Sequence, residues 1–231
     1  MSWVYIELWK YLKSIPQGNS KVPQWTIGNG NIVPAWNAYG YIGTGQRYIL
    51  SYQFIDTRDG QRYKAVRMPD ERRWMAENLN FKTANSSCYN DVESNCDNDY
   101  GRMYTQDDAQ IACPQWWKLP TRDERITMLN AVEGVYGGIQ NHGTQNSWNG
   151  TAAGKNLQNV QSGSVGSDLF GFSAILAGRY EGGYMDRDTT YAFFWDSDSV
   201  WGNNHFFHKW INWAYFNTRN KNAKLSVRCI Q

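Results

Sequence analysis

The alternation of apolar and polar side chains predicts a β-hairpin shortly after residue 50. Residues 51–56 (SYQFID) alternate into Arg58-Asp59-Gly60, and residues 61–68 (QRYKAVRM) alternate again. A period of two is typical of a half-buried strand, and a Gly-containing polar triplet between two such runs is typical of a turn.

Two helices are predicted next. Residues 105–113 place acidic side chains after Thr105, which is a suitable N-cap, and residues 121–132 begin with a Thr-x-x-Glu capping box. Beyond residue 134 the chain is rich in Gly and Asn, and strands are expected at 170–180, 191–197 and 224–231. Few helices and many short strands predict an α+β domain with long loops.

The first 50 residues show a different pattern of apolar and polar side chains. Apolar side chains in residues 3–15 recur at helical spacing, and Pro16-Gln17-Gly18 would end that helix. Residues 17–50 predict loops and short strands. We therefore expect an N-terminal extension over 1–50, a packing or oligomerisation element, and one domain over 51–231; the sequence leaves the oligomeric state open.

Composition narrows the class of partner. With Lys+Arg 23 and Asp+Glu 21 the formal net charge is +2, so we expect no nucleic-acid partner and no attraction to anionic lipid. No apolar run reaches about 18 residues, so no membrane span is expected. Aromatic residues make up 16% of the chain, which favours some exposed rings on a binding surface, although packing under long loops is equally compatible.

The four cysteines, Cys88, Cys96, Cys113 and Cys229, lack the CxxC spacing of zinc or redox sites. Two disulfides are the economical interpretation. Cys88 with Cys96 would close a short loop, and Cys113 with Cys229 would tie the middle of the chain to its last strand. Disulfides indicate an oxidising compartment, so we expect a secreted, cell-surface or virus-particle protein. The start lacks a secretory signal, which implies either a trimmed leader or another route out of the cell.

Eight sequence blocks then occur in order: FIDTRDGQRYKAV (54–66), WMAENLN (74–80), CYN (88–90), YGRMYT (100–105), CPQWWKLPT (113–121), DLFGFSAILAGRY (168–180), FWDS (194–197) and SVRC (226–229). Together they resemble the Fibrobacter succinogenes major paralogous domain, a secreted bacterial module of the C-type-lectin-like superfamily. The resemblance implies a small twisted antiparallel sheet, two short helices and long disulfide-held loops. It also implies that the last strand, 225–230, lies in the middle of the domain.

The block Lys118-Leu119-Pro120-Thr121-Arg122 is also similar to formylglycine-generating enzymes, which work through reactive cysteines and a metal. Because the four cysteines match structural positions, we expect no enzyme. The calcium triplets of sugar-binding C-type lectins, Glu-Pro-Asn or Gln-Pro-Asp with Trp-Asn-Asp, do not occur, so we expect no metal and no other cofactor. His205 and His208 lack an evident third metal ligand and are interpreted as surface residues.

Residues 195–222 mix Trp, Phe, Tyr, His, Asn and Asp without a period of 2 or 3.6, which favours a binding surface over a core. The segment is similar to the C-terminal region of retroelement-diversified proteins, where adenines in Asn codons are mutated. The sequence therefore predicts a display domain that binds a protein or glycan on another cell or particle. A protein ligand is the leading hypothesis, and a carbohydrate- or cell-wall-binding module is the alternative. Trp195, a family framework residue, is expected to be buried. The predicted ligand-binding residues are Asp196, Asp198, Ser199, Trp201, Asn203, Asn204, His205, Phe206, Phe207, His208, Trp210, Asn212, Trp213, Tyr215, Phe216 and Asn217.

Overall fold

The structure is a computed structural model in which the chain divides into two compact units, Met1–Tyr48 and Ile49–Gln231. The helix predicted over 3–15 lies outside the described residues. The residues that the structure describes are 27–28, 31–32, 41–42, 46–47, 51–135, 148–149, 152–160, 164–186, 190–197, 202–212 and 214–231.

The first unit contributes two short antiparallel hairpins. Strand β1 (Ile27–Gly28) pairs with β2 (Asn31–Ile32), and β3 (Tyr41–Ile42) pairs with β4 (Gln46–Arg47).

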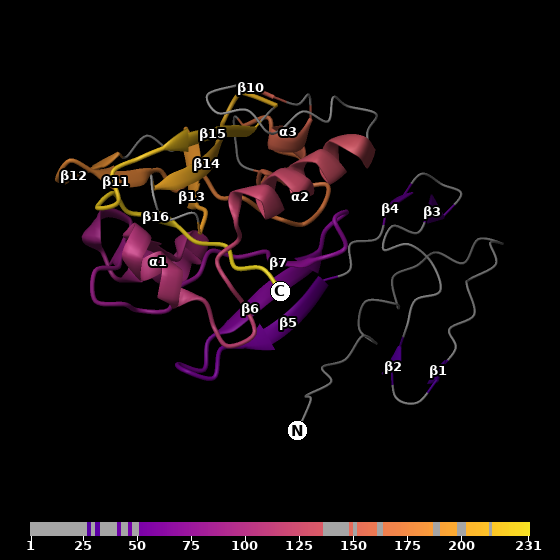
Figure 1. Ribbon diagram of the computed structural model, residues 1–231, viewed down its shortest axis with the longest axis horizontal. Coiled ribbons are helices and arrows are strands. Elements are labelled where there is room, and N and C mark those ends of the chain that lie inside the picture. Colours follow the sequence, from indigo (N-terminus) through magenta and orange to yellow (C-terminus); the bar gives the residue numbers. More distant parts are fainter. Residues whose placement is uncertain are drawn as a thin grey trace. The chain divides into compact units, whose positions relative to one another are not determined.

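The second unit begins with an antiparallel sheet in the order β5-β6-β7, formed by β5 (Ser51–Ile55), β6 (Arg62–Arg67) and β7 (Arg73–Met75) (Figure 1). At the turn between β5 and β6, the Asp56 carbonyl accepts the N–H of Gly60 at 2.8 Å, and Gly60 has φ +78°, a conformation that glycine adopts without strain. The Asp56 carboxylate also binds the Arg58 guanidinium. The predicted hairpin is confirmed.

A seven-stranded sheet in the order β10-β15-β14-β13-β16-β9-β8 forms the centre of the unit. Neighbouring strands are antiparallel except for β13 and β16, which are parallel. Strand β16 lies between β13 and β9, so the C-terminal strand is interior, as expected, although it is shorter than the predicted 224–231. The strands are β8 (Ser87–Cys88), β9 (Arg102–Tyr104), β10 (Trp148–Asn149), β13 (Tyr191–Trp195), β14 (Asn203–His208), β15 (Ala214–Thr218) and β16 (Leu225–Ser226).

Both predicted helices are confirmed, with their caps. In α1 (Gln106–Ala112) the Thr105 hydroxyl accepts the N–H of Asp108 at 3.3 Å. In α2 (Arg122–Val135) the Thr121 hydroxyl accepts the N–H of Glu124 at 3.1 Å, and the Glu124 carboxylate accepts the N–H of Thr121 at 2.9 Å. This reciprocal pair satisfies two backbone donors that the helix itself leaves unpaired. A third helix that the sequence did not predict, α3 (Ala153–Leu157), follows.

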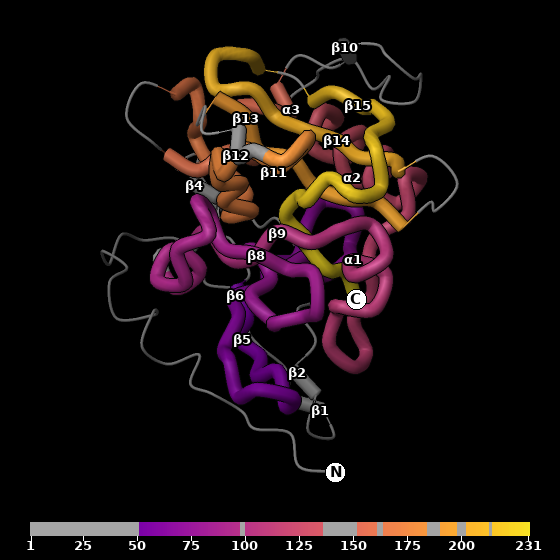
Figure 2. The backbone as a smooth tube through the Cα atoms, turned by 90° about the vertical axis from the view of Figure 1, so that its left-hand side faces the viewer, coloured from indigo at the N-terminus to yellow at the C-terminus, as the bar shows by residue number. Residues whose placement is uncertain are grey.

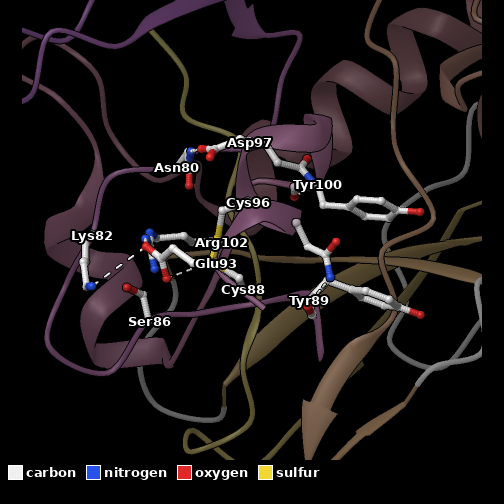
Figure 3. Close-up of a disulfide and its surroundings, with 12 residues drawn as sticks. Asn80, Lys82, Ser86, Cys88, Tyr89, Glu93, Cys96, Asp97, Tyr100 and Arg102 are labelled. Atoms are coloured by element: carbon white, nitrogen blue, oxygen red, sulfur yellow. Dashed lines mark hydrogen bonds and ion pairs between the residues drawn. A yellow bond between two sulfur atoms is a disulfide. The ribbon is translucent and has the colours of Figure 1, made fainter. Parts of the chain in front are cut away.

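The two predicted disulfides are both formed, Cys88–Cys96 across 8 residues and Cys113–Cys229 across 116 residues. The short one encloses a 3-10 turn (Tyr89–Asp91) and leads into a π-helical turn (Cys96–Tyr100). Figure 3 shows the rings of Tyr89 and Tyr100 stacked beside it, with centroids 5.1 Å apart, and Arg102 paired with Glu93. The long disulfide joins the end of α1 to the C-terminal segment.

The strand predicted over 170–180 is wrong for most of its length. Only its end belongs to a strand, β11 (Arg179–Glu181), which pairs with β12 (Tyr184–Asp186). Upstream, Asp168, Gly171 and Ser173 have positive φ, and the Asp168 carboxylate accepts both the N–H and the hydroxyl of Ser173. A strand cannot accommodate such a series of positive φ angles. The apolar residues here line the core as irregular chain.

With helices and mainly antiparallel sheets in one unit, the predicted α+β class is confirmed. None of the helices within the described ranges is long and apolar enough to cross a membrane.

Candidate functional site

The segment 195–222, which was predicted to form a binding surface, contains two strands of the seven-stranded sheet, β14 and β15. Strands β13, β14 and β15 pair in register, with Phe194 opposite His205 and His205 opposite Phe216. Because side chains alternate between the faces of a strand, each strand contributes to both sides of the sheet. The segment 195–222 therefore forms regular strands although its sequence shows no period of 2 or 3.6, and the side chains on its two faces have different surroundings.

The inner face is core. Phe172 contacts Phe194 and Phe207 edge-on at centroid distances of 6.2 and 6.5 Å, and Arg122 of α2 lies over the Phe216 ring at 4.9 Å. The expectation that these inner side chains are exposed to a ligand is wrong, since packing against α2 and residues 170–178 leaves them at 2% exposure or less. The predicted site residues on this face are Asp196, His205, Phe207 and Phe216.

A buried charged cluster lies at this face. Asp196 Oδ1 is 3.3 Å from Arg125 Nε and 3.3 Å from His205 Nδ1, and all three side chains are excluded from solvent. Burial and the positive charge of Arg125 lower the pKa of His205 to about 4. The negative charge of Asp196 acts in the opposite direction and raises this pKa, but by less. Burial also lowers the pKa of Arg125 to about 10, again opposed by Asp196. His205 is consequently neutral at pH 7 and stacks on Phe194 at 5.2 Å.

Two further residues of the segment are buried, and both donate side-chain hydrogen bonds to backbone carbonyls. Trp195 is fully buried, as expected, and its Nε1 donates to the Tyr104 carbonyl at 2.6 Å. The amide of Asn204 is also fully buried and donates to the carbonyls of Gly202 and Asn217 at 3.3 and 3.2 Å. The prediction that Asn204 contacts a ligand is wrong, because its amide is buried and links β14 to β15 by a hydrogen bond.

The outer face carries a continuous group of rings that we call the aromatic surface: Tyr191, Phe206, His208, Trp210 and Tyr215. Tyr191 contacts His208 at 4.8 Å and Phe206 at 5.6 Å. Phe206 contacts Tyr215 at 4.9 Å, and His208 contacts Trp210 at 5.5 Å. Trp210 is 61% exposed, Phe206 forms the buried floor at 8%, and the other three rings are half-buried.

Hydrogen bonding fixes the orientation of His208. Its Nδ1 accepts the backbone N–H of Trp210 at 3.1 Å, so the turn after β14 is bound to the ring. Lys209 Nζ lies 5.8 Å from the Trp210 centroid. The ring of Trp210 is thus held at the end of the sheet by the two residues before it.

A charged trio borders the same face. Arg179 and Arg219 place their guanidinium carbons 4.7 and 4.6 Å from the Phe193 centroid, and Glu181 Oε2 accepts from both, at 3.0 and 2.9 Å. Strand β11, which carries Arg179 and Glu181, lies beside β13 in both views (Figure 1, Figure 2). Sequence reasoning missed Tyr191, Arg179, Glu181 and Arg219.

The sequence offered a partial signal for them. The Arg-x-Glu pattern at 179–181 overlaps the end of the block 168–180, but only the fold brings it to Arg219, which is 38 residues further along the chain than Glu181. Of the other predicted site residues, Asn212 is exposed and Asn203 and Asn217 are half-buried. Asp198, Ser199, Trp201 and Trp213 lie outside the described residues.

No group of three or more His, Cys, Asp or Glu side chains in the described part of the chain is arranged to hold a metal ion. At its surface the arrangement presents rings, amides and guanidinium groups.

The family model of the Fibrobacter succinogenes major domain matches residues 70–231, which include both disulfides, helices α1, α2 and α3, and the strands of the aromatic surface. No curated protein and no solved structure matches the chain. Since the matched region is well over half of its length, the chain belongs to the Fibrobacter succinogenes major domain family.

Proposed function

We propose that the second unit is a display domain that binds a protein ligand through the aromatic surface. The observation that carries the proposal is the unbroken series of ring contacts from Trp210 through His208, Tyr191 and Phe206 to Tyr215, with its most exposed ring at one end. Aromatic side chains dominate protein-binding energetics because they offer a large contact area at a small entropic cost.

The frame beneath the rings supports this assignment. On the other face of these strands His205, Phe207 and Phe216 are buried, and Phe206 packs on Phe193 at 5.0 Å. Rings that are ordered before binding lose little further freedom when a ligand arrives, so more of the contact energy appears as affinity.

We also propose that the surface is diversified by a retroelement, as the Asn-, His- and Tyr-rich sequence suggests. The buried positions restrict where variation is tolerated. Substitutions among neighbouring strains should fall at exposed or half-buried positions such as His208, Asn212 and Tyr215, and spare His205 and Phe207. Substitutions spread evenly over both faces, or a coding locus without a reverse transcriptase and template repeat, would contradict diversification.

A selection experiment tests ligand binding. Peptides from a random display library are selected on the full chain, and enriched peptides are titrated against Trp210→Ala and Trp116→Ala. Both tryptophans are strongly exposed, at 61% and 79%, but Trp116 lies in the loop after α1. We expect Trp210→Ala to weaken binding at least about tenfold, as for an interface hot spot, and Trp116→Ala to leave it unchanged. Equal losses for both variants, or none for Trp210→Ala, would refute the proposal.

Carbohydrate binding is the second candidate, and the exposed ring of Trp210 beside His208 favours it, because flat rings stack on sugar faces. A glycan array probed with the full chain discriminates the two. Glycan binding that is lost in Trp210→Ala favours this candidate, whereas peptide binding without any glycan signal favours the first.

Several features support a binding role over catalysis and a location outside the cytosol. All four cysteines are in disulfides, so the reactive thiol of formylglycine-generating enzymes has no counterpart. Paired cysteines are typical of oxidising compartments, which suits a secreted, cell-surface or particle-borne protein. We further propose that the fold is C-type-lectin-like, on the sequence blocks and the interior position of β16.

A further inference from the structure

The two edges of the sheet formed by β5, β6 and β7 have different surroundings. At the β7 edge, Arg73 exchanges two backbone hydrogen bonds with Gln231, at 3.2 and 2.9 Å, and the N–H of Met75 donates to the Cys229 carbonyl at 3.0 Å. The C-terminal segment therefore covers that edge. At the β5 edge, no strand of the described residues pairs with β5 on the side away from β6 (Figure 1).

The register of the hairpin shows which backbone groups of β5 point outward. The N–H of Asp56 donates to the Gln61 carbonyl at 2.8 Å, and hydrogen-bonded and non-hydrogen-bonded pairs alternate along an antiparallel ladder. Gln53, which lies opposite Lys64, is consequently in a non-hydrogen-bonded pair. Lys64 agrees with this assignment, since its carbonyl accepts the N–H of Ala76 on the β7 side at 2.8 Å. The backbone groups of Gln53 therefore point away from β6, as do those of every second residue of β5.

Three residues of β5, Ser51, Gln53 and Ile55, thus form an outward row of backbone N–H and C=O groups. Their side chains are exposed as well, that of Ile55 to 42%. Proteins usually protect such an edge with a lysine, a proline or a bulge, because an unpaired row of donors and acceptors pairs readily with another chain. Strand β5 has the sequence SYQFI, without charge or proline, and its five residues pair with β6 in unbroken register. It is therefore an edge that can accept a further strand.

The strand is complementary to itself in the antiparallel direction. With a two-fold axis at Gln53, Ser51 lies opposite Ile55 of the partner subunit, and Gln53 lies opposite the partner's Gln53. All three outward residues then exchange backbone hydrogen bonds, and no like charges face each other. Tyr52 lies opposite the partner's Phe54 in a non-hydrogen-bonded pair, the type in which side chains are closest.

The rings of Tyr52 and Phe54 are oriented by their own protomer. Phe54 stacks on Trp117 with centroids 4.4 Å apart and contacts Tyr63 at 5.6 Å, and the guanidinium carbon of Arg73 lies 5.1 Å from the Tyr52 centroid. Both rings are half-buried. An aromatic pair across the two strands would cover part of the area that remains, so pairing adds apolar burial to the backbone hydrogen bonds.

We propose that the protein forms a homodimer in which β5 of one protomer pairs antiparallel with β5 of its partner about Gln53. The self-complementarity of the edge carries the inference, because a second copy supplies a matching row of backbone groups and a matching aromatic side chain. Assembly stops at two through this sheet, since the C-terminal segment covers its other edge. The inference does not rest on the proposed ligand binding, although a dimer would offer a repetitive ligand two aromatic surfaces.

Charges placed at the two-fold axis test both the pairing and its register. Sedimentation velocity of the full chain over a series of concentrations measures the equilibrium between monomer and dimer. Gln53→Lys and Gln53→Glu each bring like charges opposite each other, and each should weaken dimerisation at least about tenfold. An equimolar mixture of the two variants should restore dimerisation as a heterodimer, and high salt should weaken that heterodimer.

Gln53→Pro tests the contribution of the backbone. Because the N–H of Gln53 points outward, proline at this position removes no ladder hydrogen bond within the protomer, and the fold should persist. It does remove the hydrogen bonds between the two Gln53 residues, so dimerisation should weaken at least about tenfold. Asn222→Lys is the control, because Asn222 is an exposed amide in the turn before β16 and outside this sheet. It should dimerise like the unchanged chain, and thermal unfolding checks that each variant is folded.

Several results would overturn the inference. They are a chain that stays monomeric at every concentration, a dimer that Gln53→Lys and Gln53→Pro leave unchanged, and a mixture of the Lys and Glu variants that stays monomeric. A dimer that is lost in Trp210→Ala but kept in Gln53→Lys would place self-association on the aromatic surface. A monomeric chain that binds a synthetic SYQFI peptide would assign the β5 edge to an extended peptide in place of a second copy.

Discussion

The inner and outer faces of β13, β14 and β15 are built from similar residues, yet they are buried to different extents: the outer face is core at Phe193, Trp195 and Phe206 and becomes exposed towards Trp210. Each face has a histidine of β14 in contact with a ring of β13: His205 on Phe194 inside, and His208 against Tyr191 outside. Inside, the histidine meets buried Arg125 and Asp196; outside, it orients an exposed tryptophan. Residue type alone therefore does not distinguish buried from exposed positions, because the elements that pack against each face determine burial.

Truncating an inner ring should have the largest effect. Phe207 is fully buried between Phe172, Phe194 and His205. We expect Phe207→Ala to lower the free energy of unfolding by about 3–5 kcal/mol, through lost burial and the cavity left behind. Chemical denaturation followed by fluorescence measures it.

Tyr215→Ala is the matched change on the outer face, where the ring is half-buried on Phe206. Its cost should be about half as large or less, since burial sets the transfer free energy. Similar decreases in the free energy of unfolding for the two variants would mean that Tyr215 is packed as tightly as Phe207. This result would contradict the difference in burial between the two faces.

Acid should destabilise the inner face through His205. Its pKa is about 4 in the folded chain and 6.5 in the reference state, so the unfolded chain takes up a proton first as pH falls. Stability from this group is complete above about pH 6.5 and is lost progressively down to about pH 4. At pH 4.5 the loss should reach about 2–3 kcal/mol. Denaturation at a series of pH values measures it.

His205→Phe removes the titration and keeps a ring stacked on Phe194. The variant should lose less stability than the unchanged chain between pH 7 and pH 4.5, while carboxylates elsewhere titrate alike in both. Parallel pH profiles would show that the pKa of His205 is the same in the folded and the unfolded chain, contrary to the lowered pKa beside Arg125.

Local signals predicted much of the fold correctly. The hairpin at Gly60, the Thr105 cap and the Thr121–Glu124 capping box depend on residues a few positions apart, so the sequence displays them directly. Both disulfides also followed from cysteine number and spacing. Sequence reasoning captures interactions between residues that are close in the chain, and disulfides whose pairing the number and spacing of the cysteines restrict.

Strand β14 was missed because the expected signal of a strand is alternation, and a strand covered on both faces does not alternate. Four successive residues, Asn204 to Phe207, are buried. The polar side chains of Asn204 and His205 suggested an exposed surface. Each is buried, however, and interacts with a residue on another strand or distant in the sequence. The adjacent pairs Phe193-Phe194 and Phe206-Phe207 were the available clue, because neighbouring rings on one strand require both faces to be covered.

The smallest effect on stability is expected at the aromatic surface itself. Trp210 is 61% exposed, and it contacts His208 and Lys209 of the same turn. Trp210→Ser should change the free energy of unfolding by no more than about 1 kcal/mol, as for other surface substitutions. A display surface needs this tolerance, since its residues must change without loss of the frame. A loss approaching that of Phe207→Ala, measured by the same denaturation, would make Trp210 a structural residue and remove the most exposed ring from the proposed binding surface.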